Sequence, residues 1–209
     1  MVHEADAGAA LEGEVAQLFS LVAEALAGAT DALLGGEPAE GSRIVAADTS
    51  VDELTRRLSA QLWGRVEHLV PDTGELRRLV GLLMILPELE RSADLAEHIA
   101  QRAVTQVGGE MSPVSRGIVQ RMSEVALDMW REAAGSYLEG GAAATALDEA
   151  DEELDILHER LTSEVASSVM PPPVAAQVTL LGRFYERLGD HAVNVARRVD
   201  LLPPEHTRR

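Results

Sequence analysis

The sequence contains no cysteine and no lysine, and only 3% of its 209 residues are aromatic. Without cysteine, the chain has no disulfides, no thiolate metal ligands and no cysteine nucleophile. Without lysine, it has neither a Schiff-base residue nor the lysine of a Walker-type phosphate loop, and all 18 basic residues are arginine. These absences exclude several kinds of catalytic and redox site.

Long apolar runs are missing as well. The longest, Leu79 to Leu86, ends at Pro87 and is far shorter than the roughly 20 residues that a membrane helix needs. The first residues, Met1 to Asp6, are acidic and lack the apolar segment of a signal peptide. We therefore expect a soluble, cytoplasmic protein with no membrane span.

Positive charge is scarce. The 35 acidic residues outnumber the arginines and give a formal net charge of −17. No segment supplies the concentrated positive stripe that nucleic acid or an anionic membrane requires, so neither is expected as a partner. Long-range attraction favours cations and basic patches on other proteins.

Six segments carry apolar residues at steps of three and four, the period of a helix with one buried face. Ser112 and Pro113 are typical of a helix N-cap and first position. The pattern predicts an all-α fold of two tandem three-helix bundles, residues 1–109 and 110–209. The segments end or begin at Gly35-Gly36, Pro71, Gly108-Gly109, Gly140-Gly141, Pro171 to Pro173 and Pro203-Pro204.

Paired acids recur in both halves at a spacing of four residues, which places both carboxylates on one helix face. Like charges so placed repel, so each pair indicates a positive partner, either a metal ion or an arginine. The pairs are Asp48 and Asp52, Glu90 and Asp94, Asp151 and Asp155, and Glu186 and Asp190.

Antiparallel pairing of the second and third helix of each half would bring two acid pairs together, giving two sites of four carboxylates. Clustered hard oxygen ligands suit magnesium, calcium, manganese or iron. His158 and His191 could each add a nitrogen ligand, although a histidine satisfied within the fold is the commoner case. Solvated helix edges with arginine partners remain the alternative interpretation.

No catalytic motif accompanies the acids. The sequence has no Glu-x-x-His, no His-Glu-x-x-His, no glycine-rich phosphate cradle and no Gly-x-Ser-x-Gly elbow. We therefore predict that the protein is not an enzyme. A binding protein whose carboxylate sites store or buffer metal is one interpretation of the pattern, and a purely structural bundle is another.

The stretch from Glu186 to Val195, which reads Glu-Arg-Leu-Gly-Asp-His-Ala-Val-Asn-Val, resembles the signature of the PhoU family, a helical Glu-Arg-Ile-Gly-Asp followed by Asn-Ile. The first copy, Glu90 to Asp94, keeps both acids. The resemblance covers nearly the whole chain, including the acidic start of the middle helix in each half. It implies two tandem three-helix bundles, multinuclear metal clusters held by the acid pairs, and a homodimer.

The resemblance also implies a function. Members are cytoplasmic regulatory adaptors of phosphate uptake, which contact the ATPase subunit of the phosphate ABC transporter and a sensor histidine kinase. In that role they keep the phosphate-starvation response off when phosphate is plentiful.

The first half departs from the signature at three positions. Ala93 replaces the glycine that the second half has at Gly189, and His98 stands where the second half has Asn194. The methyl group of Ala93 is expected to resist close helix approach. Pro87 should remove one backbone hydrogen bond and kink its helix. We therefore expect the second site to be the more regular one.

Overall fold

All regular structure in the computed structural model is helical over the residues that it describes, 2–68, 73–140 and 143–203, which confirms the predicted fold class. The six long helices match the six predicted segments, and one short helix joins the halves. They are α1 (Val2–Gly35), α2 (Pro38–Glu67), α3 (Thr73–Val104), α4 (Val107–Glu110), α5 (Pro113–Glu139), α6 (Ala144–Ser167) and α7 (Pro172–Val199).

Two of the predicted glycine stops and the predicted N-cap are confirmed. Gly36 and Gly140 adopt positive φ angles of 71° and 74° directly after α1 and α5, a conformation that glycine reaches without strain. The Ser112 side chain accepts a hydrogen bond from the Ser115 N–H, and Pro113 opens α5. The predicted turns at Pro71 and Gly141 and the predicted end at Pro204 lie outside the described residues.

The short helix α4 was not predicted. The sequence predicted that the third helix ends at Gly108-Gly109, but α3 ends at Val104. Gln106, between α3 and α4, adopts the left-handed backbone conformation, with φ 57°. A Cβ atom on Gly108 would lie 1.9 Å from the Leu33 carbonyl oxygen. Gly108 is therefore required by close packing of α4 against α1, and it does not end a helix.

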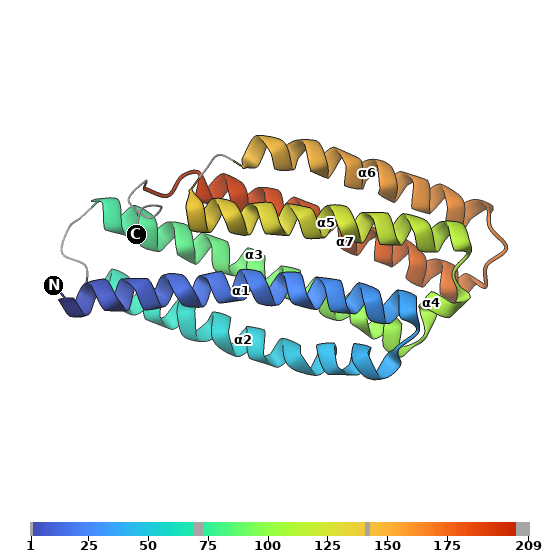
Figure 1. The fold of residues 1–209 in the computed structure, drawn as a ribbon, viewed down its shortest axis with the longest axis horizontal. Coiled ribbons are helices and arrows are strands. Elements are labelled where there is room, and N and C mark those ends of the chain that lie inside the picture. Colours follow the sequence, from blue (N-terminus) through green and yellow to red (C-terminus); the bar gives the residue numbers. More distant parts are fainter. Residues whose placement is uncertain (1, 69–72, 141–142, 204–209) are drawn as a thin grey trace.

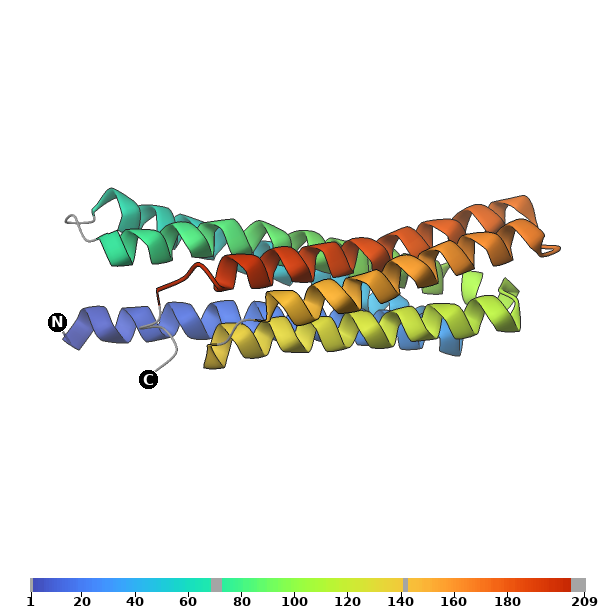
Figure 2. The same ribbon diagram turned by 90° about the horizontal axis from the view of Figure 1, so that it is seen from above.

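The helices lie along the long axis of the molecule, and the two halves meet along two helix pairs (Figures 1 and 2). α3 lies beside α7 and runs antiparallel to it, and α1 lies beside α5. Phe19 of α1 stacks on Tyr137 of α5 with ring centroids 5.3 Å apart. The apolar core is therefore continuous between the halves, and α3 and α7 bring the two acidic signatures into neighbouring positions.

α1 contains a segment, Ala10–Gly35, that is long and apolar enough to cross a membrane, with a mean hydropathy of 1.4. Most of its large apolar side chains are buried within the bundle, where α1 contacts α2, α3 and α5. Leu18, Val22 and Leu26, for example, are 0% exposed. α1 is thus the core helix of this fold, and no other described helix meets the same criteria.

α3 continues through Pro87 as a single helix. Leu86 and Leu89, on either side of the proline, are almost completely buried. Packing of these side chains offsets the backbone hydrogen bond that proline cannot donate. The acid pair of α3 therefore follows Pro87 on unbroken helix.

Candidate metal centre

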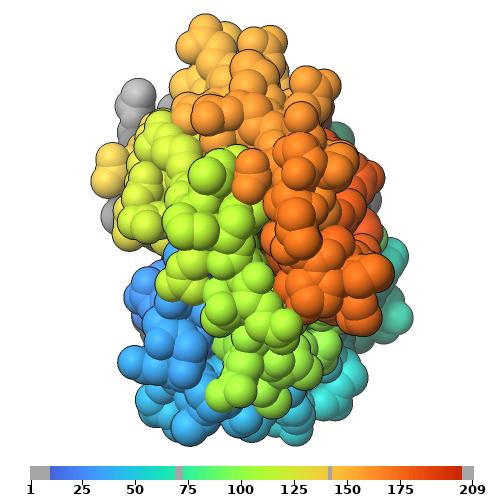
Figure 3. Space-filling view, turned by 90° about the vertical axis from the view of Figure 1, so that its right-hand side faces the viewer, coloured from blue at the N-terminus to red at the C-terminus, as the bar shows by residue number. Residues whose placement is uncertain are grey.

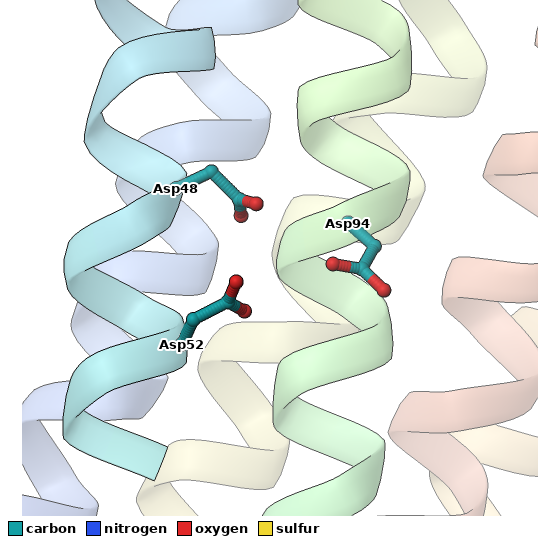
Figure 4. A group of neighbouring side chains, drawn as sticks. All are labelled: Asp48, Asp52 and Asp94. Atoms are coloured by element: carbon teal, nitrogen blue, oxygen red, sulfur yellow. The ribbon is translucent and has the colours of Figure 1, made fainter. Parts of the chain in front are cut away.

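Three carboxylates of the first half converge between α2 and α3. Figure 4 shows Asp48 and Asp52 extending from α2 towards α3, and Asp94 on the neighbouring part of α3. One oxygen of each lies within 4.8 Å of the others. The antiparallel pairing predicted from the acid spacing therefore exists here.

The fourth predicted residue, Glu90, lies one turn before Asp94 and falls outside that group of three. It is still close enough to interact electrostatically. Burial raises the pKa of Glu90, and the charges of Asp94 and Asp52 raise it further. Glu90 is thus at the edge of the cluster.

Within the described residues, no arginine forms an ion pair with the acids of the first cluster, although the charge of Arg91 acts to lower the pKa of Glu90. Burial, followed by the charges of Asp52, Asp94, Glu97 and Glu90, raises the pKa of Asp48 to about 6. Arg91, the nearest arginine in sequence to Glu90, pairs instead with Glu88, at 3.5 Å. Full ionisation of the cluster is therefore unfavourable without a cation.

The second half gathers its acids less tightly. Burial, followed by the charges of Asp190, Asp155 and Glu186, raises the pKa of Asp151 to about 6, so the four predicted residues do share one region. No three of their oxygens come within 4.8 Å of one another among the described side chains. Glu186 pairs with Arg183. The expectation that the second site is the more regular one is therefore wrong for the oxygen geometry.

Gly189 explains part of this difference. A Cβ atom there would lie 2.5 Å from Asp151 Oδ1 and 2.6 Å from Leu154 Cδ1, so α6 packs directly against the backbone of α7. At the matching position of the first half, Ala93 lines a hollow of about 180 Å³ between α1, α2 and α3, which Asp48 also lines. The methyl group of Ala93 is accommodated without preventing the cluster from forming.

The two candidate histidines face different surroundings. His191 is 6% exposed and its Nδ1 atom lies 2.5 Å from Glu88 Oε2 on α3, whereas its Nε2 atom is buried and has no hydrogen-bond partner among the described residues. His158 packs at Gly182, and its charge acts to lower the pKa of Glu186. His191 therefore pairs with Glu88 of α3, in keeping with the commoner case of a histidine held within the fold, and His158 stays close to the second acid group.

The donor set of the first cluster fits a hard cation. Ligand oxygens on opposite sides of an ion with bonds of about 2.0–2.6 Å lie at most roughly 4–5 Å apart, and the three aspartate oxygens meet that limit. In the second half, Asp151 Oδ1 and Glu186 Oε2 are buried and have no hydrogen-bond partner among the described residues. Both are available for a cation.

Sequence reasoning missed two acids that add to these sites. Glu97 raises the pKa of Asp48, and Asp148 raises that of Asp151. Each lies three residues from a predicted ligand, Asp94 and Asp151 respectively, so the helical period was a usable signal.

An ionic contact between the halves was also missed. Glu88 is 4% exposed, and its Oε1 atom lies 2.7 Å from Arg198 Nη1. Burial acts to raise the pKa of Glu88, but hydrogen bonds from Arg198 and His191 outweigh it and hold the pKa below its usual value. The partners come from α7, and no local sequence pattern links them to α3.

Two repeated three-helix units, each with acids paired across its second and third long helix, define a class of duplicated helical-bundle proteins with carboxylate clusters. The PhoU domain model matches the chain twice, at residues 15–103 and 119–199. The chain belongs to the PhoU family.

Curated relatives match along most of their length. A phosphate-specific transport system accessory protein PhoU homolog of Rhizobium meliloti is 25% identical and covers 90% of this chain and 82% of its own. The PhoU homolog 2 of Mycobacterium tuberculosis is 29% identical, with 90% of this chain and 91% of its own covered.

Solved structures show the same fold. The crystal structure of PhoU from Pseudomonas aeruginosa superposes with a TM-score of 0.85 at 21% identity, over 92% of this chain and 94% of that one. The PhoU structure from Streptococcus pneumoniae gives 0.84 at 19% identity, over 95% and 96%.

Proposed function

We propose that this protein is a cytoplasmic regulatory adaptor of phosphate uptake, which holds the phosphate-starvation response off by linking the phosphate ABC transporter to a sensor histidine kinase. The observation that carries the proposal is the double match to the PhoU domain, together with relatives named as accessory proteins of the phosphate-specific transport system. The proposal assigns a binding role, with the transporter ATPase subunit and the kinase as partners, and no reaction.

The acid clusters have a structural part in this proposal. A divalent cation or an iron cluster held by Asp48, Asp52 and Asp94, with Glu90 beside them, would remove the repulsion between α2 and α3. Asp151, Asp155, Glu186 and Asp190 would hold the second ion between α6 and α7. Occupancy then fixes the relative position of the helices and the surface that they present to a partner.

A genetic experiment tests the adaptor role. Deletion of the gene should raise expression of a phosphate-starvation reporter in phosphate-rich medium, and the intact gene should restore repression. An unchanged reporter in the deletion strain would contradict the adaptor role, whatever the metal content of the protein.

A biochemical experiment tests the metal centre. Elemental analysis of the purified protein should find bound metal, and the share held by the first cluster should be lost in the double variant Asp52→Asn, Asp94→Asn. The matched control is Asp128→Asn with Glu132→Gln, two exposed acids on α5, which should leave the metal content unchanged. Equal metal content in both double variants would remove the cluster from the proposal.

The convergence of Asp48, Asp52 and Asp94 favours a second candidate function, a metal-storing or metal-buffering bundle. The two functions differ in one outcome. Reversible release of several ions per chain, with an unchanged phosphate reporter in the deletion strain, supports storage. Derepression of the reporter supports the adaptor.

A further inference from the structure

A hollow of about 420 Å³ lies where the end of α3, α4 and the start of α7 meet, away from both acid clusters. Figure 3 looks onto this end of the molecule, where the green α4 region faces the orange start of α7. The volume falls within the range of small-molecule sites, roughly 300–1,000 Å³. The two halves of the chain both contribute to its wall.

The Arg102 guanidinium lines this hollow and makes no ion pair with a carboxylate of the described residues. Among the described residues, the hydrogen bond of Arg102 runs from Nη1 to the His98 carbonyl oxygen, at 2.9 Å. Its Nε atom is buried and has no partner. The group lies over the Phe184 ring, 4.9 Å from the centroid. A half-buried cation without an ion pair is notable in a chain whose net charge is −17.

The surroundings of Arg102 do not neutralise it. Burial lowers its pKa while the charge of Glu97 acts in the opposite direction, but an arginine remains protonated in either case. Glu110 also lines the hollow and makes no ion pair with Arg102 within the described residues. The matching residue of the second half, Arg198, is by contrast paired with Glu88.

The rest of the wall combines hydrogen-bonding and apolar groups. Thr105 and Gln177 offer a hydroxyl and an amide, and Val107 and Val174 offer apolar surface. The N-terminus of α7 has no side-chain cap, and Pro172 and Pro173 have no N–H, so Val174 is its first residue with one. The positive end of the α7 dipole therefore adds to the attraction of Arg102 for an anion.

We propose that this hollow binds a small organic anion, whose charged group pairs with the Arg102 guanidinium and whose body lies against Val107 and Val174. A phosphate ester and a carboxylate both have the required chemistry, since each accepts charge-assisted hydrogen bonds from a guanidinium. The apolar wall and the volume favour an anion with a carbon body over an inorganic one. This site is independent of the metal centre and of the adaptor role.

Titration of the full-length protein at fixed ionic strength tests the proposal. Glycerol 3-phosphate, butyrate and inorganic phosphate are added separately, and backbone amide signals are followed by NMR. We expect saturable shifts of Gln101, Thr105 and Gln177 with at least one of the two organic anions, and weaker binding of inorganic phosphate. Comparison of the two organic probes distinguishes the phosphate ester from the carboxylate.

Three variants assign the binding to this hollow. Arg102→Gln and Gln177→Glu should each weaken binding by about tenfold or more, the first by removing the cation and the second by adding a repelling charge. Arg77→Gln, an exposed arginine at the other end of α3, should leave the affinity unchanged. Since Gln177→Glu retains Arg102, the test holds even if Arg102→Gln fails to fold.

Three outcomes would overturn the proposal. One is the absence of saturable shifts with both organic anions. Another is an affinity that neither Arg102→Gln nor Gln177→Glu changes. The last is inorganic phosphate binding as tightly as the organic probes, which would show that charge alone is recognised.

Discussion

Ala93 on α3 and Gly189 on α7 occupy matching positions of the two repeats and differ by one methyl group. Gly189 allows α6 to approach until Asp151 Oδ1 lies 2.5 Å from the site of a Cβ atom, whereas Ala93 borders a hollow. The surroundings of this position therefore differ between the two acid clusters in spite of their shared sequence pattern. The close packing at Gly189 predicts that a methyl group there destabilises the protein, whereas a methyl group on a glycine in open space does not.

Gly189→Ala should lower the free energy of unfolding by about 1–3 kcal/mol, because the new methyl group overlaps Asp151 and Leu154. The control is Gly117→Ala in α5, where a Cβ atom meets nothing within 4 Å and alanine should stabilise the helix by about 0.5–1 kcal/mol. Urea unfolding followed by circular dichroism measures both. Equal effects of the two substitutions would contradict the close approach at Gly189.

The pH dependence of stability follows from Asp48, whose pKa rises from 3.8 to about 6 in the folded protein. Between these two pH values the folded state binds more protons at Asp48 than the unfolded state does. The contribution of Asp48 to the free energy of unfolding therefore decreases as the pH rises, and the full decrease is reached above the folded-state pKa. In metal-free protein, Asp48→Asn should raise the melting temperature above pH 6 and flatten its decline across the window from 3.8 to about 6.

Thermal melts at several pH values, with and without chelator, measure this effect. The exposed substitution Asp128→Asn serves as the control, since Asp128 pairs with Arg131 on the surface. A wild-type protein whose stability does not fall through the window would show that repulsion at Asp48 is compensated by groups other than a bound cation.

At the scale of helices, α3 and α7 meet along an antiparallel seam, and the two ends of this seam bring together the same pair of repeat positions. Counting from Glu90 and Glu186, Glu88 matches Phe184 and Arg102 matches Arg198. One end of the seam pairs Glu88 with Arg198, and the other places Arg102 over Phe184. The seam is thus ionic at one end and aromatic at the other.

Glu88→Ala should destabilise the protein by about 3–5 kcal/mol, because it leaves Arg198 and His191 without their acceptor in a buried position. The control Glu124→Ala removes an exposed partner of Arg121 and should cost less than about 1 kcal/mol. Urea unfolding provides both values. A cost for Glu88→Ala as small as that of the control would mean that water replaces the carboxylate at the seam.

The periodic apolar pattern predicted the six long helices, because each has a continuous buried face, but it placed the end of α3 at Gly108-Gly109 when α3 ends at Val104. It could not predict α4, a helix of four residues that follows the positive φ angle of Gln106 and is positioned by tertiary contact with α1. The acid pairs predicted which helices meet, since repulsion at a spacing of four residues calls for a partner. They could not predict the contact between Glu88 and His191, because that contact depends on the axial register of α3 relative to α7.

For the whole molecule, packing between the halves predicts one cooperative unfolding transition. Thr30 of α1 hydrogen-bonds to Tyr185 of α7 at 2.7 Å and accepts from Ser123 of α5 at 2.9 Å, all three buried. Unfolding of either half alone would break these buried hydrogen bonds and leave their partners in the other half unsatisfied. That residues 1–109 and 110–209 form separate bundles stays a prediction about chain organisation and does not imply independent stability.

A tryptophan probe can test this cooperativity. Trp130, 1% exposed, reports on the second half, and Trp63, 57% exposed, lies in the first. In Trp63→Phe, urea transitions followed by Trp130 fluorescence and by circular dichroism should coincide. Distinct midpoints for the two signals would show that the halves unfold separately.

The two ends of the α3–α7 seam differ, and this difference predicts how many organic anions one chain binds. An internally duplicated chain suggests sites in pairs, as the acid clusters are. Among the described residues, Glu88 pairs with Arg198, whereas Arg102 makes no ion pair and contacts the Phe184 ring and the His98 carbonyl oxygen. If the hollow beside Arg102 binds an anion as proposed, calorimetry should count one organic anion per chain, although the chain contains two repeats.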